Sequence, residues 1–468
     1  MHHPVTFTRL GDFTATRRLL ILSAIAVGLG LAGAVIAVAL LDLIALSTNL
    51  FFHHRLSIEA ASPVSHDLGR WAILVPVLGG LIVGLMARFG SERIRGHGIP
   101  EAIEAILING SRVEPKLALL KPLSAAIAIG SGGPFGAEGP IVMTGGAVGS
   151  LVAQCFHLSS AERKTLLVAG SAAGMAAVFA TPLAAVLLAV ELLLFEWKPR
   201  SFVPAALAAA TAAAARRWLL GLGPIFPVTP HPIAISMTAL GACCVAGAAA
   251  ALLSIAMTRA VYASEDAFLR LPIHWMWWPA IGGVAIGIGG WFFPQALGVG
   301  YDTFGALLQQ DQPVTMLAGV LLVKSTIWAV ALGSGTSGGV LAPLLMVGGA
   351  LGGLEANVFP AMGPGFWPLV SMAAVLGGTM RTPFTAVVFA LELTHDFNMV
   401  LPLLVAVTGA VQLTVVDPDA AHAPIGTISL ADLLRGRAQV LDAEQRRERV
   451  ITFRMPLPAW VRERSGGM

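Results

Sequence analysis

The stretch 130–140, GSGGPFGAEGP, interrupts apolar sequence that runs from 117 to 156. It contains five glycines, two prolines and a single carboxylate, Glu138. Glycine and proline break helices, so the stretch predicts irregular backbone between two apolar helices. In a membrane, such backbone is tolerated only where it is buried in protein or lines a cavity, and a lone ionisable residue there indicates a functional site. The unpaired amides and the positive dipole end of the second helix predict an anion-binding site.

The composition is that of an integral membrane protein. Of the 468 residues, 56% are hydrophobic and 12% are charged, whereas soluble domains have about 25% charged residues. The segment 19–46 is apolar apart from Asp42, and it exceeds the roughly 20 residues that span a bilayer. It follows Arg17 and Arg18 and lacks a small-residue cleavage site, which predicts a retained helix and not a signal peptide. Together with the basic tail, these arginines predict that both chain ends are cytoplasmic.

Two stretches of the first half recur in the second half. Residues 130–140 match 333–343 at five of eleven positions with an offset of 203, and 180–192 match 381–393 at seven of thirteen with an offset of 201. Glycine-rich breaks at corresponding positions of two halves indicate a binding site between transporter repeats. If the halves are inverted, both breaks direct a helix N-terminus toward the midplane. We expect a first transmembrane half (1–220), a link (221–232), a second transmembrane half (233–416) and a short cytoplasmic tail that includes the last helix (417–468).

Three motifs, each opening a helix, resemble the anion-site motifs of the CLC chloride channel and transporter family. They are GHGIP at 96–100, GAEGP at 136–140 and GGVLAP at 338–343. The resemblance covers essentially the whole chain and is to the bacterial type without CBS domains. It implies an all-α polytopic fold of about eighteen helices in two inverted repeats, whose broken helices meet at an anion site. It also implies a homodimer in the bacterial inner membrane, with a separate anion pathway in each subunit.

The resemblance assigns roles to individual residues. Glu138 is similar to the family's gating glutamate, whose carboxylate competes with the anion for the same amides and leaves when it is protonated. Lys121 and Lys324 precede the anion motifs, and each either adds positive potential or pairs with a carboxylate or a backbone carbonyl. The expected anion-binding residues are His97, Gly98, Ile99, Gly139, Gly339, Val340 and Leu341.

The sequence departs from the family pattern at four places. His97 stands where the family usually has serine, and its imidazole is also a hydrogen-bond donor. Leu341 replaces phenylalanine. The family's pore tyrosine has no match, because APIG (423–426) occupies its place and the chain's two tyrosines lie elsewhere. The inner glutamate of the family's exchangers falls at Leu192. Proton-coupled exchange is favoured, and a passive channel remains the alternative.

Other features have structural interpretations. The repeat mates Glu191 and Glu392 are expected to bind neighbouring helix ends, and the tryptophans between 275 and 278 are expected to form an interfacial belt. The three cysteines, Cys155, Cys243 and Cys244, have neither disulfide nor metal spacing. The expected partners are chloride, protons, a second copy of the chain and the lipid bilayer. The pattern predicts no cofactor, no metal and no nucleic acid.

Two further functions compete with chloride transport. GTSGG at 335–339 fits the nucleophile motif G-x-S-x-G, and with Ser337 and His422 it is loosely typical of an intramembrane serine protease. That interpretation leaves the repeat and GAEGP unexplained, and the chain is expected not to be an enzyme. A family member selective for fluoride or nitrate is the other alternative, and the intact GAEGP favours chloride over fluoride.

Overall fold

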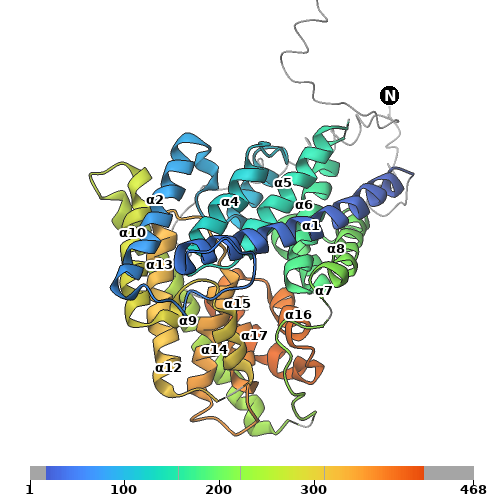
Figure 1. Ribbon diagram of the computed structural model, residues 1–468. Coiled ribbons are helices and arrows are strands. Elements are labelled where there is room, and N and C mark those ends of the chain that lie inside the picture. The colour runs from blue at the N-terminus through green and yellow to red at the C-terminus, as the bar shows by residue number, and fades with distance from the viewer. Residues whose placement is uncertain (1–16, 157, 222, 234, 310, 416–468) are drawn as a thin grey trace, which may run out of the picture.

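The computed structural model describes residues 17–156, 158–221, 223–233, 235–309 and 311–415, and within these ranges the chain forms helices and no strands (Figure 1). The predicted tail 417–468, which includes His422 and APIG, lies outside them. The first half contains α1 (Arg17–His53), α2 (Leu74–Phe89), α3 (Ile99–Leu107), α4 (Leu117–Gly130), α5 (Glu138–Gln154), α6 (Ser160–Phe179), α7 (Pro182–Leu188) and α8 (Pro199–Leu219). The second half contains α9 (Met237–Leu269), α10 (Trp278–Phe292), α11 (Tyr301–Gln309), α12 (Val314–Gly319), α13 (Ser325–Gly333), α14 (Leu341–Glu355), α15 (Phe366–Met380), α16 (Pro383–Thr394) and α17 (Val400–Val415).

The helices fall into two length classes. Five segments are long and apolar enough to cross a membrane: α1, α2 with the turn before it, α9, α12 continued into α13, and α17. The apolar helices α4, α14, α15 and α16 have only 10–17 residues, fewer than the roughly 20 that span a bilayer. Helices of this length end inside the protein, as the glycine-rich breaks predict.

Close backbone contacts relate the two halves by a two-fold rotation. A Cβ on Gly80 in α2 would lie 2.2 Å from the carbonyl oxygen of Pro279, and a Cβ on Gly283 in α10 would lie 2.5 Å from that of Pro76. Each residue has its counterpart 203 positions away, so the same contact is made twice in reciprocal form. Reciprocity of this kind is the signature of a two-fold axis. It confirms the repeat expected from the sequence.

The carboxylates of Glu191 and Glu392 make a second reciprocal contact. Glu191, on the π-helical turn that continues α7, accepts hydrogen bonds at 3.2 and 2.8 Å from the first amides of α16. Glu392, near the end of α16, accepts at 3.0 and 2.8 Å from the first amides of α7. A carboxylate at a helix N-terminus binds orphan amides and faces the positive end of the dipole. The expectation that both glutamates bind neighbouring helix ends is confirmed.

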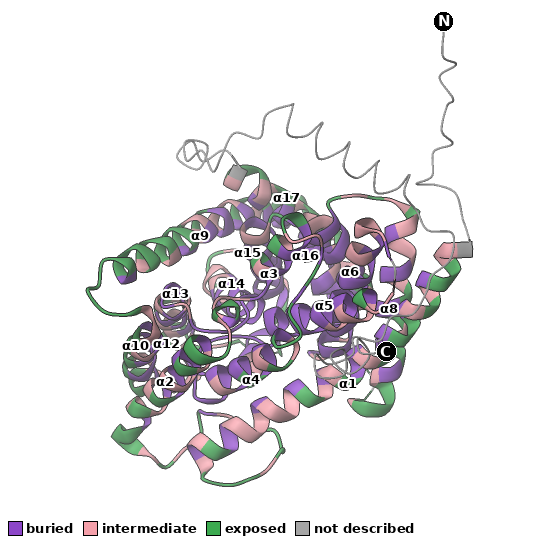
Figure 2. Ribbon diagram, turned by 90° about the horizontal axis from the view of Figure 1, so that it is seen from above, coloured by how far each residue is buried: buried purple, intermediate pink, exposed green. Residues whose placement is uncertain are grey.

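The helices that carry the predicted anion motifs lie in the interior. Most residues of α5 and α14 are buried. Figure 2 shows this from above: α5 and α6 are mostly buried, while α1, α9 and α10 have exposed outer faces. In Figure 1, α4 and α5 lie above α14 and α15. The loops before α5 and α14 therefore meet between the halves and away from lipid.

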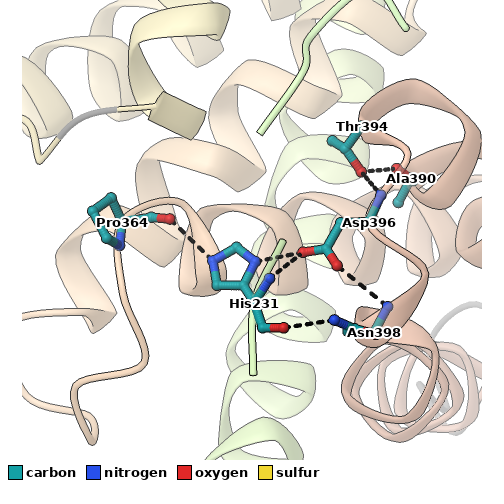
Figure 3. A network of polar contacts seen from close by, with 6 residues as sticks. All are labelled: His231, Pro364, Ala390, Thr394, Asp396 and Asn398. Carbon is teal, nitrogen blue, oxygen red and sulfur yellow. Dashed lines mark hydrogen bonds and ion pairs between the residues drawn. The ribbon is translucent and has the colours of Figure 1, made fainter. Parts of the chain in front are cut away.

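A buried polar clamp fastens the link between the halves to the second half (Figure 3). The Nδ1 atom of His231 lies 2.6 Å from the carboxylate of Asp396, and its Nε2 atom lies 3.0 Å from the carbonyl oxygen of Pro364. Both ring nitrogens lie within hydrogen-bond distance of oxygen acceptors. Asp396 also accepts from the amides of His231 and Asn398 at 3.1 and 3.2 Å. The clamp joins the link to the segments that precede α15 and α17.

Replacing Asp396 by alanine should strongly destabilise the protein. The substitution leaves the His231 ring and two amides without their acceptor, and each buried polar group left unsatisfied costs about 1–3 kcal/mol. Thermal unfolding of the purified protein in detergent should show a lower midpoint for Asp396→Ala. The matched control is Asp302→Ala, at an exposed position on α11, and it should unfold like the wild type. Equal midpoints for all three proteins would contradict the assigned role of the clamp.

Candidate functional site

The loops before α5 and α14 pair through their backbones. The amide of Gly136 donates to the carbonyl oxygen of Gly339 at 3.2 Å, and the amide of Gly339 donates to that of Gly136 at 2.9 Å. The two glycines are repeat mates, so the two-fold axis passes between them. The N-termini of α5 and α14 consequently lie side by side.

The GHGIP loop closes against the same place. A Cβ on Gly139 would lie 1.8 Å from the carbonyl oxygen of His97 and 3.2 Å from the Cα atom of Gly339. Gly98, whose φ angle is +94°, lies so close that its own Cβ would be 2.5 Å from the carbonyl oxygen of Gly139. Only glycine permits these approaches. All three motifs, far apart in the sequence, meet at one point.

The carboxylate of Glu138 occupies the N-terminus of α14. Glu138 is the first residue of α5 and is 0% exposed. Its Oε1 atom accepts a hydrogen bond from the amide of Ala342 at 2.5 Å, and its Oε2 atom has no partner among the described residues. The buried Lys324 adds positive charge nearby. The side chain thus takes the place that an anion takes at a helix N-terminus.

The predicted anion-binding residues divide into two groups. The amide of Gly98 already donates to the Oε2 atom of Glu101 at 2.7 Å, and that of Gly339 donates to Gly136, so neither is free for an anion. The other predicted amides stand at helix starts, where first-turn amides lack intrahelical partners. They belong to Ile99, Gly139, Val340 and Leu341.

The two predicted lysines are both fully buried and bind backbone carbonyls. The Nζ atom of Lys121 donates to Ile94 and Gly96 at 2.9 Å each, and that of Lys324 donates to Gly298 at 2.8 Å. Of the two roles expected from the sequence, these contacts show the second, pairing with backbone carbonyls. Lys121 thereby fixes the segment that precedes His97.

A cavity of about 800 Å³ reaches two of the three motifs, GHGIP and GGVLAP, from one side. His97 lines it and is half-buried, and its Nδ1 atom is buried without a partner among the described residues. Val340 lines it from the loop before α14. The other polar and charged lining residues are Arg95, Glu101, Thr258, Tyr262, Glu265 and Thr379. We call this space the inner cavity.

Two of the predicted belt tryptophans line the inner cavity instead. The guanidinium carbon of Arg95 lies 4.7 Å from the ring centroid of Trp275 and 5.6 Å from that of Trp278, within the range of cation–π contacts. Trp277 is 47% exposed, as a belt residue would be. The prediction was wrong for Trp275 and Trp278, because the 3₁₀ turn before α10 directs neighbouring side chains to different sides.

On the other side of Glu138 the space is small and mostly apolar. A cavity of about 10 Å³ lies beside Ala342 and is lined by Phe179, Phe304 and Leu345, with Tyr301 at the start of α11. Leu192, at the position of the family's inner glutamate, is half-buried and packs against the hydrophobic core.

The protease motif is not arranged as a nucleophile would be. Ser337 is fully buried, and its hydroxyl oxygen accepts a hydrogen bond from the hydroxyl of Ser124 at 3.1 Å. A nucleophilic serine is normally bonded to its base. His422, the base proposed from sequence, lies outside the described residues.

The fold matches solved membrane-transporter structures. A slow cyanobacterial Cl⁻/H⁺ antiporter superimposes with a TM-score of 0.74 and 20% identity, covering 93% of this chain and 100% of that one. A CLC-type fluoride/proton antiporter gives a TM-score of 0.72 and 20% identity, covering 86% of this chain and 97% of that one. These similarities establish the fold: two inverted repeats whose broken helices meet at the centre.

Sequence comparison identifies the family. The model of the voltage-gated chloride channel family matches residues 79–414, so the chain belongs to that family, the CLC family of membrane proteins. A putative chloride channel protein, ClcB-like, of Ralstonia nicotianae is 31% identical over 73% of this chain and 82% of its own length. The H⁺/Cl⁻ exchange transporter ClcA of Vibrio vulnificus is 28% identical over 75% and 78%.

The structure adds site residues that the sequence did not single out. Ala342 supplies the amide that binds Glu138, and its position directly after Leu341 in GGVLAP was the available signal. Arg95 and Glu265 line the inner cavity, but they are 170 positions apart, and no local pattern connects them.

Replacing Gly139 by alanine should disrupt the site. The added Cβ would fall 1.8 Å from the carbonyl oxygen of His97, and overpacking of this kind costs about 1–3 kcal/mol or more. Chloride should raise the thermal midpoint of the wild type, because a ligand stabilises the state that binds it, and this rise should vanish in Gly139→Ala. The control is Gly409→Ala in α17, where nothing lies within 4 Å of the added atom. An unchanged chloride effect in Gly139→Ala would show that this contact does not shape the site.

Proposed function

We propose that this protein transports chloride across the membrane in exchange for protons, with Glu138 as the protonatable gate. The observation that carries the proposal is the position of the Glu138 carboxylate, bound to the amide of Ala342 at the N-terminus of α14. A bound carboxylate marks the place as one that accepts a single negative charge. The names of the relatives, a chloride channel protein and an H⁺/Cl⁻ exchange transporter, support the same function.

The mechanism is a competition for one set of amides. While Glu138 is ionised, its carboxylate occupies the amides of α14 and excludes chloride. When Glu138 binds a proton, it loses the charge that held it there, and chloride takes the vacated amides. Return of the carboxylate expels chloride and requires release of the proton. One proton and one class of anion are therefore linked through the same group.

The convergence of several helix ends makes a dehydrated anion tolerable. One helix N-terminus contributes about 0.3–2 kcal/mol, whereas the effective penalty for burying an ion is several kcal/mol. Here the starts of α3, α5 and α14 meet, and Lys324 lies nearby. The amides of Ile99, Gly139, Val340 and Leu341 are the proposed chloride ligands, with His97 as a side-chain donor.

A passive chloride channel is the second candidate. Leu192 stands at the position where the family's exchangers have an acid, and it packs against the hydrophobic core. A channel needs the Glu138 gate but no inner proton path. Fluoride and nitrate are alternative anions for the same amides.

We further propose that the protein is a homodimer in the bacterial inner membrane, with cytoplasmic ends and an organisation in halves at 1–220 and 233–416 joined by 221–232. The resemblance to the family supports the dimer. The exposed apolar residues Leu183 and Phe384, which are repeat mates on α7 and α16, provide a surface for the second subunit or for lipid.

Glu138→Gln should abolish the pH dependence of chloride flux. In the wild type, flux should rise as the pH falls, because protonation removes the competing carboxylate. The glutamine variant has no charge to lose, so its flux should stay constant across the pH range and move no protons. Chloride efflux from proteoliposomes with simultaneous pH recording tests this. Glu59→Gln, at an exposed loop position, is the control and should behave like the wild type. A wild-type pH profile in Glu138→Gln would exclude Glu138 as the gate.

Ser337→Ala separates transport from proteolysis. The Ser337 hydroxyl binds Ser124, and backbone amides are the proposed chloride ligands, so chloride efflux from proteoliposomes should change little. A protease would lose its activity completely on losing its nucleophile. Loss of a measured peptidase activity in Ser337→Ala, with intact folding, would revive the enzyme hypothesis.

A further inference from the structure

We infer that His97 is the group that relays protons between the inner cavity and Glu138, in place of the acid that the Leu192 position lacks. The inference rests on the proposed function, because it presupposes that protonation of Glu138 controls transport. It gives His97 a role beyond that of an anion ligand.

Glu138 has no direct access to water. The residue is 0% exposed, and its unpartnered Oε2 atom is buried. A proton that reaches or leaves this carboxylate from the cavity side must therefore pass through another group. The cavity beside Ala342 offers little help, because it is mostly apolar and its volume of about 10 Å³ is room for about one water.

His97 borders both the inner cavity and the buried site around Glu138. The residue lines the inner cavity and is half-buried, so part of the ring is accessible from there. Its Nδ1 atom is buried and lacks a partner among the described residues. Its carbonyl oxygen packs against Gly139, the residue that follows Glu138. His97 thus borders the 800 Å³ cavity and, through its carbonyl, the residue next to Glu138, and imidazole is the side chain that exchanges protons near neutral pH.

Charged groups surround His97 on every packed element. Glu101 of α3 binds the neighbouring Gly98 amide, and Lys121 of α4 binds the carbonyl of Gly96. Glu138 of α5 lies beyond Gly139. Across the cavity are Glu265 of α9 and Arg95, which pairs with Glu92. Glu101 and Glu265 are cavity carboxylates from which a proton can arrive, while Lys121 and Arg95 are already engaged with carbonyl or carboxylate oxygens.

The relay step balances in protons and charge. In the proposed step, a proton from water in the inner cavity adds to Nε2 of the ring and forms an imidazolium. The proton on Nδ1 then passes to the Glu138 carboxylate, directly or through one water. The ring becomes neutral with its proton on Nε2, and Glu138 becomes a neutral acid. The reverse sequence returns the proton to the cavity.

Chloride uptake into membrane vesicles of defined sidedness tests the relay. Right-side-out and inverted vesicles from expressing cells expose opposite faces of the protein to the bath, so bath pH can be lowered on one face at a time. The wild type should respond to pH from both faces. His97→Gln, which keeps an N–H donor but does not titrate, should lose the response from the inner-cavity face and keep it from the other. The retained response shows that the variant is folded and active, and each profile is normalised to its own maximum.

Three companion variants keep the outcome unambiguous. His97→Ser provides a second non-titrating side chain and should behave like His97→Gln. Glu138→Gln should lose both responses; if it keeps them, the proposed gate fails, and the relay fails with it. Glu101→Gln keeps an acceptor for Gly98 and should retain both responses. If the His97 variants respond from both faces, or lose both responses, or if Glu101→Gln alone loses the inner response, the relay is overturned while the Glu138 gate stands.

Discussion

The reciprocal hydrogen bonds between Gly136 and Gly339 are the constraint on which the rest of the site depends. Non-helical backbone inside a membrane protein needs partners for its polar groups, and each loop finds them in the other half. Neither half can satisfy its own loop alone. The pairing also fixes the starts of α5 and α14 side by side, which brings the first amides of one helix within reach of the first side chain of the other.

A fully buried carboxylate at this place is stable only because it is bound. Glu138 has a hydrogen bond from Ala342 and the charge of Lys324 nearby, yet one of its oxygens remains unpartnered. In the proposed mechanism, a small anion takes over the same amides once the carboxylate is protonated. A structural glutamate such as Glu392 differs, because both of its oxygens accept hydrogen bonds. Glu138 and Glu392 thus differ in the number of carboxylate oxygens that are hydrogen-bonded within the described residues.

The sequence predicted the features that depend on local spacing and on the internal repeat. Glycine and proline marked the breaks, the offset of 203 paired them, and the positions of Glu191 and Glu392 in matching segments indicated helix ends. It could not show which amides were already used, because the bonds of Gly98 and Gly339 depend on a distant partner or on side-chain rotation. It also misplaced Trp275 and Trp278, since membrane belts and cavity linings draw on the same residue type. Contacts between repeat-related residues could be predicted from the sequence. Contacts between residues that have no counterpart in the other half could not.

The two halves differ at the position that carries the proposed gate. The repeat mate of Glu138 is Leu341, so only one half contributes an acid at the axis. Two carboxylates there would repel each other, and one of them would hold a proton permanently. With a single carboxylate, the start of α14 faces that group, and the opposite position stays apolar. The backbone symmetry brings the two helix starts together, and the single Glu–Leu difference places one carboxylate between them.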